Sequence, residues 1–226
     1  MNCCSGSLPA VARHFDAQHA EADLSRYRKH GPDPTTRRLA DALRTMGVSG
    51  ASLLDIGSGI GVLTLELLQA GARKAMLIDA STAALTVARA EAVRRGFTSE
   101  LELIPGDFTG LADAIPEADI ALLDRVVCCY PEYQALLEGA ARRSSRAVAL
   151  SYPRARWFVK AGVAVENLMR RARKRAFRTF VHSPELMAGV LQRAGFQLAH
   201  RETTPGWSIE VHRRISDERP GDHPPD

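Results

Sequence analysis

Apolar and polar residues follow two rhythms along this chain of 226 residues. Short, continuous apolar runs are typical of strands buried on both faces of a sheet, and they occur at 52–56, 75–78, 101–104, 120–123 and 148–150. Helical spacing, with apolar residues every three or four positions, fills the intervals at 62–70, 81–96 and 131–143. Strands that alternate with helices predict an α/β fold with a doubly wound, mostly parallel sheet and helices on both faces.

Both ends of the chain extend this pattern. An Asp-Pro start predicts a helix over 33–47, and a weaker helical stretch precedes it at 8–29. A long helical region follows Arg154, and a further helix is expected over 183–195. The last two apolar runs, 196–201 and 207–212, bring the sheet to seven strands. We expect an antiparallel terminal strand, since such a two-strand finish is compatible with an antiparallel edge on an otherwise parallel sheet.

These elements predict one main domain, since a chain of this length builds a single core. We expect an N-terminal helical lid over 1–34, the α/β domain over 35–213 and a disordered tail over 214–226. A basic helical insertion interrupts the domain at 154–182. The composition, 45% hydrophobic and 25% charged, excludes a collagen, a disordered protein and a disulfide-dense miniprotein.

The four cysteines stand as two adjacent pairs, Cys3-Cys4 and Cys128-Cys129. This arrangement does not match a disulfide framework, so we expect a reducing, cytoplasmic location. It does not match the spacing of structural zinc ligands either, and we expect no metal site. No apolar run approaches the ~20 residues that span a bilayer, and the first residues lack the pattern of a secretion signal.

The run 53–61, Leu-Leu-Asp-Ile-Gly-Ser-Gly-Ile-Gly, predicts a ligand-binding turn between the first core strand and its helix. Glycines there allow the backbone to approach a ligand and leave the first helical N–H groups free. The spacing of Gly57, Gly59 and Gly61 differs from the dinucleotide fingerprint, which needs a glycine where Val62 stands. This departure argues against a nicotinamide-dependent oxidoreductase.

Carboxylates follow the next two core strands. Asp79, 22 positions after Gly57, is placed to accept the two hydroxyls of a ribose. Asp107 follows the third strand, where its carboxylate suits the exocyclic amine of adenine, and Phe108 or its backbone can flank the ring. Because the carboxyl ends of parallel strands share one edge of the sheet, these groups and the glycine loop predict a nucleoside site there.

Residues 51–130 resemble the class I S-adenosylmethionine-dependent methyltransferases. The resemblance assigns the glycine loop to the first motif of that family, Asp79 to ribose binding and Asp107-Phe108 to adenine contacts. It assigns Asp124-Arg125, after the fourth strand, to the motif near the methionine moiety. It implies S-adenosylmethionine as the cofactor, held by Asp55, Gly57, Ser58, Gly59, Asp79, Ala80, Asp107, Phe108, Asp124 and Arg125.

The C-terminal part is similar to the magnesium-protoporphyrin O-methyltransferases. Cys129-Tyr130-Pro131 stands where that family has His-Tyr-Pro, and 177–182 reads Phe-Arg-Thr-Phe-Val-His. A terminal Trp-Ser-Ile-Glu strand adds to the likeness. The chain departs from that family at Cys129 and at Ala80-Ser81. The resemblance therefore indicates architecture and acceptor site, and it does not establish a tetrapyrrole substrate.

Methyl transfer from a sulfonium is an in-line displacement, to which positioning can contribute ~7–11 kcal/mol. A general base is needed only for a weakly acidic acceptor such as an alcohol. The candidates for a catalytic group are Asp124 at the end of the fourth strand, His182 before a capped helix, and Tyr27 in the N-terminal lid. Each also has a structural interpretation: Asp124 can hold the cofactor or cap the loop, His182 can be a packed side chain, and Tyr27 can be a packed or solvated residue of the lid.

The net charge of +4 arises in one segment. Residues 154–178 contain nine basic residues and one acid (+8), whereas the rest of the chain holds 21 basic and 25 acidic residues (−4). The segment is apolar in its first half and densely cationic over 170–178. The segment can be a solvated helix face. Its functional interpretation is a small, anionic, partly apolar methyl acceptor, with peripheral membrane contact through 156–178. Together with the resemblance to methyltransferases, this leads us to expect methylation of that acceptor on oxygen.

Two other functions remain open. An RNA methyltransferase would grip phosphates through 170–178, although the absence of aromatic residues interleaved with this cluster makes nucleic acid the weaker prediction. A non-catalytic nucleotide-binding protein that keeps the cofactor pocket is the other alternative.

Overall fold

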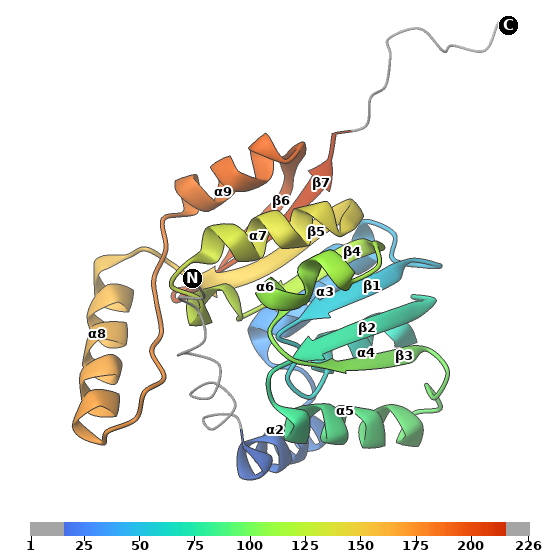
Figure 1. The fold of residues 1–226 in the computed structure, drawn as a ribbon, viewed down its shortest axis with the longest axis horizontal. Coiled ribbons are helices and arrows are strands. Elements are labelled where there is room, and N and C mark those ends of the chain that lie inside the picture. The colour runs from blue at the N-terminus through green and yellow to red at the C-terminus, as the bar shows by residue number, and fades with distance from the viewer. Residues whose placement is uncertain (1–15, 216–226) are drawn as a thin grey trace, which may run out of the picture.

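The structure is a computed structural model that describes residues 16–215 (Figure 1). The strands are β1 (Ser52–Ile56), β2 (Lys74–Asp79), β3 (Leu101–Pro105), β4 (Ala118–Asp124), β5 (Ser144–Pro153), β6 (Phe196–Thr203) and β7 (Trp207–Arg214). The α-helices are α2 (Ala17–His30), α3 (Pro34–Thr45), α4 (Val62–Gln69), α5 (Thr82–Arg94), α6 (Phe108–Leu111), α7 (Tyr133–Arg142), α8 (Trp157–Ala172) and α9 (Pro184–Arg193). Two single-turn helices, η1 (Ala112–Ala114) and η2 (Val127–Cys129), complete the described elements.

The seven strands form one sheet in the order β3-β2-β1-β4-β5-β7-β6. Strands β1 to β5 are parallel to one another, and β7 is antiparallel to both β5 and β6. The doubly wound sheet with an antiparallel terminal strand is confirmed. The two final strands form the antiparallel edge of the sheet. β7 lies between β5 and β6, because it pairs with β5 on one side and with its hairpin partner on the other.

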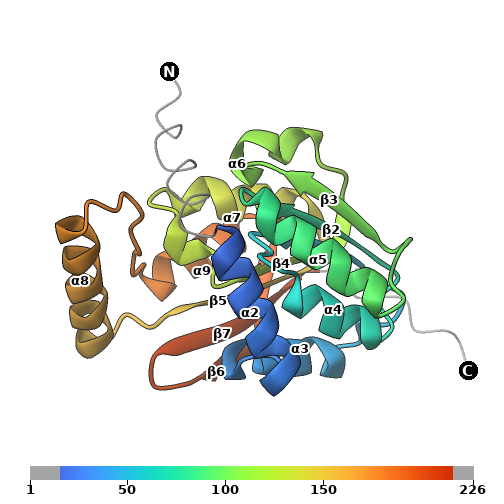
Figure 2. The same cartoon turned by 90° about the horizontal axis from the view of Figure 1, so that it is seen from below.

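Helices cover both faces of the sheet (Figures 1 and 2). All five residues of β1 are buried. Leu54 and Ile56 join the core under α6, α7 and α9, whereas Leu53 joins the core under α3, α4 and α5. A third cluster joins Leu24 of α2 to Val87 of α5. The continuous apolar runs in the sequence follow from this burial on two faces.

Capping side chains begin the helices where the sequence predicted. Asp33 accepts the backbone N–H groups of Thr35 and Thr36 at 3.0 and 3.3 Å. Ser81 and Ser183 cap α5 and α9 in the same way. These contacts satisfy donors that have no partner within the helix. By contrast, α6 and η2 were not predicted, since a single turn carries no periodicity.

The segment 154–182 is helical only over Trp157–Ala172, and residues 173–183 contain no helix. Both views show α8 standing apart from the sheet, joined to it by the chain that follows β5 and by the extended segment that leads to α9 (Figures 1 and 2). Strand β7 continues through Arg214, one residue beyond the expected end of the domain. The predicted helical stretch at 8–15 and the tail at 216–226 lie outside the described residues. None of the helices in 16–215 has the length and apolar content needed to cross a membrane.

Candidate functional site

A cavity of about 1060 Å³ lies at the carboxyl edge of the parallel strands. Its walls come from the ends of β1, β2 and β4, from the chain between α2 and α3, and from one face of α8. All ten residues expected to hold the cofactor line it: Asp55, Gly57, Ser58, Gly59, Asp79, Ala80, Asp107, Phe108, Asp124 and Arg125. The fold therefore brings together groups from four separate strand ends.

The glycine loop between β1 and α4 needs its glycines for two different reasons. Gly57, Gly59 and Gly61 have φ values of 66°, 54° and 72°, a region that favours glycine. A Cβ on Gly57 would lie 2.3 Å from Val126 Cγ2, and one on Gly61 would lie 2.8 Å from Leu77 Cδ2. A Cβ on Gly59 would meet open space. The outer glycines thus permit close packing, while Gly59 presents bare backbone at the cavity.

Asp79, at the end of β2, is tied to the glycine loop. Its Oδ2 accepts the Gly59 N–H at 2.8 Å, and its Oδ1 accepts the Ser81 N–H at 2.7 Å. Burial raises the pKa of this carboxyl, while the two backbone donors oppose that shift. Each oxygen keeps lone-pair capacity for a further donor, which is the arrangement that a ribose diol would use.

Asp107 is also held in place, as the cap of α6. Its carboxylate accepts the Thr109 hydroxyl at 2.7 Å and the Tyr130 hydroxyl at 2.7 Å. Burial, with Asp107 nearby, raises the pKa of Tyr130 well above its usual range. The Phe108 side chain is only 1% exposed and packs in the core against Gly139. Of the two possibilities for Phe108, its backbone rather than its ring is therefore available to flank a ligand.

Asp124, at the end of β4, accepts the hydroxyls of Thr36 and Ser151, each at 2.5 Å. The next residue, Arg125, has a φ of 58° and forms an ion pair with Asp33 at 2.9 Å. Asp33 is the cap of α3, so one cluster joins β4, β5 and α3 at the cavity wall. This placement makes Asp124 a positioning residue that holds the loop after β4.

Asp55 lies at the base of the cavity, where it is 2% exposed. Its Oδ2 accepts the Thr64 hydroxyl at 2.7 Å. Burial raises the pKa of Asp55 to about 7, and the charges of Asp124 and Asp79 add to this shift. Three carboxylates that face one cavity favour a ligand with positive charge.

The residues present fit S-adenosylmethionine. The Ser58 hydroxyl oxygen is buried and has no hydrogen-bond partner among the described residues, which leaves an unused polar group in the glycine loop. Beside it, Gly59 offers open backbone, and Asp79 has acceptor capacity for hydroxyls. The acidic base of the cavity suits a ligand with sulfonium and ammonium groups.

Tyr27 lines the cavity, but its hydroxyl is engaged elsewhere. It donates to Glu66 Oε1 at 2.8 Å, and the Arg95 guanidinium lies over the ring at 4.7 Å. Burial and the Glu66 contact raise the pKa of Tyr27 beyond its usual range. Its neighbour Arg28 pairs with the buried Glu91 of α5 at 2.8 Å. These contacts fix α2 to α4 and α5, and they favour the structural interpretation of Tyr27 over the catalytic one.

His182 does not line the cavity. Its ring packs against Tyr133, with centroids 4.4 Å apart, and its Nε2 is buried without a partner among the described residues. Burial lowers the pKa of His182, so the neutral ring is favoured. This placement favours the packing interpretation. The position of His182 follows from a backbone hydrogen bond nearby. The N–H of Phe180 donates to the carbonyl oxygen of Cys128 at 2.8 Å, which holds the segment before α9 alongside η2.

Cys128 and Cys129 line the cavity as free thiols. Their Sγ atoms lie 3.3 and 3.8 Å from the carbonyl oxygen of Arg125. The described residues contain no group of three or more His, Cys, Asp or Glu side chains that could hold a metal. Cys3 and Cys4 lie outside those residues.

Only one face of α8 reaches the cavity. Val159, Val163 and Arg170 contribute to the lining, together with Phe177 from the following segment. Arg170 donates to Glu166 and to the Thr179 hydroxyl, both at 2.7 Å. Of the basic residues in 154–178, Arg170 alone is among the lining residues. Most of the positive charge of that segment therefore does not face the cavity.

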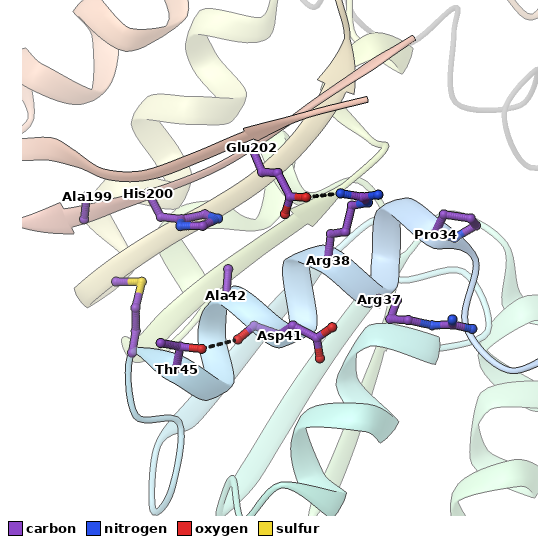
Figure 3. Close-up of a pocket in the computed structure, with 10 residues that line it drawn as sticks. Pro34, Arg37, Arg38, Asp41, Ala42, Thr45, Ala199, His200 and Glu202 are labelled. Carbon is purple, nitrogen blue, oxygen red and sulfur yellow. Dashed lines mark hydrogen bonds and ion pairs between the residues drawn. The ribbon is translucent and has the colours of Figure 1, made fainter. Parts of the chain in front are cut away.

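A second hollow of about 680 Å³ lies between α3 and β6 (Figure 3). Arg38 and Glu202 form an ion pair across it, and His200 lies beside them. The hollow contains none of the residues that the sequence pointed to. It shares Pro34 and Arg37 with the larger cavity, but no residue from the ends of β1, β2 or β4 lines it, so the cavity at that edge is the candidate site.

Several lining or supporting residues were missed by sequence reasoning. Thr36 and Ser151 hold Asp124 from elements far apart in the chain, and no local pattern marks them. Tyr130 stood in the Cys-Tyr-Pro run but was not linked to Asp107. Asp33 was recognised as a helix cap, and its pairing with Arg125 needed the fold.

The fold and this site define a class of protein, and comparisons with known proteins agree with it. The family described as "Methyltransferase domain" matches residues 53–146. Ribosomal protein L11 methyltransferase of Geobacter metallireducens is 36% identical over 84 residues, which are 35% of this chain and 28% of that protein. The chain thus spans less than a third of the length of the curated relatives it matches.

Solved structures agree over a longer stretch. Magnesium protoporphyrin IX methyltransferase from Synechocystis PCC 6803, with bound SAH, covers 92% of this chain and 99% of its own, with a TM-score of 0.70 and 19% identity. An O-methyltransferase family protein from Burkholderia thailandensis covers 90% of this chain and 64% of its own, with a TM-score of 0.66 and 16% identity. At sequence identities below 25%, these similarities establish the fold alone.

Residues 53–146 are therefore a methyltransferase domain, set in the Rossmann-like fold of class I S-adenosylmethionine-dependent methyltransferases. S-adenosylmethionine is the cofactor that this domain implies.

Proposed function

We propose that the whole chain transfers the methyl group of S-adenosylmethionine to an oxygen of a small, anionic and partly apolar acceptor. The cofactor supplies an electrophilic methyl group on a sulfonium with a neutral thioether as leaving group. The residues of the chain have to align the acceptor with that methyl group and exclude water, since an ionised acceptor needs no general base.

The observation that carries the proposal is the division of one cavity into two chemically different ends. The glycine loop and the three carboxylates of Asp55, Asp79 and Asp124 lie at the sheet. Apolar Val159, Val163 and Phe177 lie at α8, together with Arg170 and its ion-pair partner Glu166. The acidic end suits the cationic cofactor, and the α8 end suits an acceptor with an apolar body whose acidic group binds Arg170.

The positions of the candidate bases support an acceptor that arrives ionised. Tyr27 donates its hydroxyl to Glu66, His182 packs against Tyr133, and both oxygens of Asp124 already accept hydroxyl groups. A carboxylate or phenolate oxygen fits such a site, because it needs placement and no deprotonation.

Cofactor binding is tested by calorimetry with S-adenosylhomocysteine. We expect binding by the full chain and at least a tenfold loss of affinity in Asp79→Ala, because hydroxyl acceptors are lost and the glycine loop is released. Asp113→Ala is the matched control, since Asp113 has a 92% exposed side chain and lies outside the cavity. No binding at millimolar concentration, or equal binding by Asp79→Ala, would refute the assignment.

The acceptor is tested with methyl-labelled cofactor and a panel of small carboxylic acids and phenols that carry apolar groups. For an acceptor found in this way, Arg170→Ala should raise KM about tenfold while S-adenosylhomocysteine affinity stays unchanged. Arg171→Ala, one position away and outside the cavity, should leave both values unchanged. Alkaline release of labelled methanol would identify a carboxyl ester. Turnover of neutral or basic acceptors only would contradict the proposal.

RNA methylation is the second candidate, and the exposed cations of 171–175 favour it. It predicts RNA binding that weakens steeply with salt and with neutralisation of that cluster. Trp157 and Phe158 stand at the opposite end of α8 from the cluster, so they offer no stacking surface beside it.

A further inference from the structure

Helix α8 has two faces with different surroundings. Val159, Val163, Asn167 and Arg170 recur at spacings of three and four, and they are the half-buried positions of the helix. Three of them line the cavity, and Asn167 bonds to the backbone of Thr179 in both directions, at 2.7 and 3.0 Å. This inner face is therefore held against the segment that follows the helix.

The outer face of α8 is apolar and exposed. Trp157, Val165, Leu168 and Met169 have exposed fractions of 81%, 56%, 66% and 48%. Positions 157, 161, 165, 168 and 172 follow helical spacing and are tryptophan, alanine, valine, leucine and alanine. No residue of the helix is buried. A helix that is apolar toward solvent along its length exposes surface that monomeric proteins usually cover.

Positive charge borders this apolar face. Lys160 and Arg171 lie along one side of this face on the helix. Arg173, Lys174 and Arg175 follow at the C-terminal end of the helix. All five side chains are exposed. Glu166 is the one acid on the helix, and it is paired with Arg170 on the inner side. The outer side of α8 thus combines apolar side chains with unopposed cations.

We propose that the outer face of α8 docks on an anionic lipid surface, with the apolar side chains in the interface and the cations against the headgroups. An amphipathic helix with a cationic border has the chemistry for this mode of binding, and it lies in the interface without crossing it. Both views place α8 at the periphery, away from the sheet, where a flat surface can reach it (Figures 1 and 2).

The area of this face argues against a second copy of the chain as the occupant. A helix of 16 residues is about 24 Å long, and a stripe of about 10 Å width covers roughly 240 Å². A stable protein interface buries about 800 Å² per partner. Two cationic borders would also repel each other, whereas an anionic surface attracts them.

Docking through this face would place the inner face of α8 beside the membrane, since the same helix forms the wall of the cavity. An acceptor with an apolar body would then reach the cavity from the lipid interface. The docking proposal depends on the exposed face alone, so its test does not depend on the identity of the methyl acceptor.

The test uses the full chain and sedimentation with vesicles. Vesicles of phosphatidylcholine with about one third phosphatidylglycerol should bind the protein at least tenfold more strongly than phosphatidylcholine alone. Trp157 is the more exposed of the two tryptophans, so its emission should shift to shorter wavelength on binding. An unshifted spectrum or equal binding to both vesicles would overturn the proposal.

Two sets of variants assign the binding to α8. Leu168→Ser should lower vesicle binding about tenfold, whereas Leu186→Ser, which alters a side chain of similar exposure (63%) on α9, should not. A variant with glutamine in place of Arg171, Arg173, Lys174 and Arg175 should lose vesicle binding. The charge-matched control carries glutamine at Arg73, Lys74, Arg89 and Arg213, which are exposed elsewhere. An equal loss in the control would mean attraction by net charge only and would refute the assignment.

Two further outcomes would give the face to another occupant. If the native chain is a dimer in gel filtration and Leu168→Ser is a monomer, the outer face of α8 binds a second copy of the chain. Vesicle binding that begins only after deletion of residues 2–15 would assign it to that segment. Unchanged S-adenosylhomocysteine binding by every variant shows that the fold is intact, because none of the altered residues lines the cavity.

Discussion

Asp55 shows at the scale of one residue how the fold changes an ordinary side chain. In the sequence it is the aspartate before the glycine loop, and in the structure it is buried with Asp124 and Asp79 acting on its charge. Its pKa rises to about 7, mainly because burial disfavours the charged form. The carboxyl that the resemblance assigned to cofactor binding is therefore also a source of pH-dependent stability.

We expect the free energy of unfolding to fall as the pH rises from about 4 to about 7. The folded protein holds the Asp55 proton up to a pKa of about 7, whereas the unfolded chain releases it near 3.8, so the fold loses stability across this window. The loss is at most about 4 kcal/mol, at about 1.4 kcal/mol for each pKa unit. Urea unfolding without cofactor at pH 5 and pH 8 measures it.

Asp55→Asn is the matched variant, since an amide oxygen still accepts the Thr64 hydroxyl at the same place. Its stability should change less between pH 5 and pH 8 than that of the native chain. An equal pH dependence in both proteins would show that Asp55 ionises normally in the fold.

At the scale of elements, α2 is attached through one buried carboxylate. Glu91 is fully buried and receives Arg28 from α2 as well as Arg94 and Arg95 from its own helix. Hydrogen bonds from these guanidinium groups lower the pKa of Glu91 to about 2. Tyr27 adds the contact with Glu66 of α4. The lid expected over 1–34 thus includes a helix that is fixed to the domain by specific polar contacts.

Arg28→Ala should loosen α2 without unfolding the domain, since Tyr27 and Leu24 still hold the helix. Glu91 keeps two guanidinium partners, and the Arg28 side chain is 46% exposed, so we expect a loss of at most about 1 kcal/mol in global stability. Hydrogen exchange of 17–30 should accelerate up to about fivefold, the equivalent of about 1 kcal/mol, because the helix loses its ion pair with α5. Arg94→Ala removes a partner of the same carboxylate within α5 and should leave α2 protected. Equal protection in both variants would contradict this role.

At the scale of the whole molecule, the structure places acidic and basic side chains on different surfaces. Carboxylates gather at the carboxyl edge of the sheet, while the cations of 171–175 stand on the outer side of α8. The overall charge of +4 therefore describes neither surface. Of the basic segment, only Arg170 lies among the lining residues, and it is paired with Glu166 there, so the acceptor end is not a strongly positive mouth.

The sequence alone determined the class of fold and the edge of the sheet where the cavity lies. Apolar runs such as 52–56 are readable because burial on two faces demands continuous apolar residues, and the caps at Asp33, Ser81 and Ser183 act within one turn. The glycine loop and the strand-end acids were also local signals. Parallel strands bring their carboxyl ends together whatever the details of packing.

Only the tertiary structure decided what depends on partners distant in the chain. The hydroxyls that hold Asp124 come from α3 and β5, the partner of the Tyr27 hydroxyl comes from α4, and the ring against His182 comes from α7. The place of β7 between β5 and β6 likewise depends on pairing across the sheet. The sequence showed that the segment containing α8 is apolar in its first half and cationic in its second, but which face of the helix turns to the cavity depends on how the chain packs. A sequence pattern carries local preferences, whereas these contacts exist only once the chain has closed on itself.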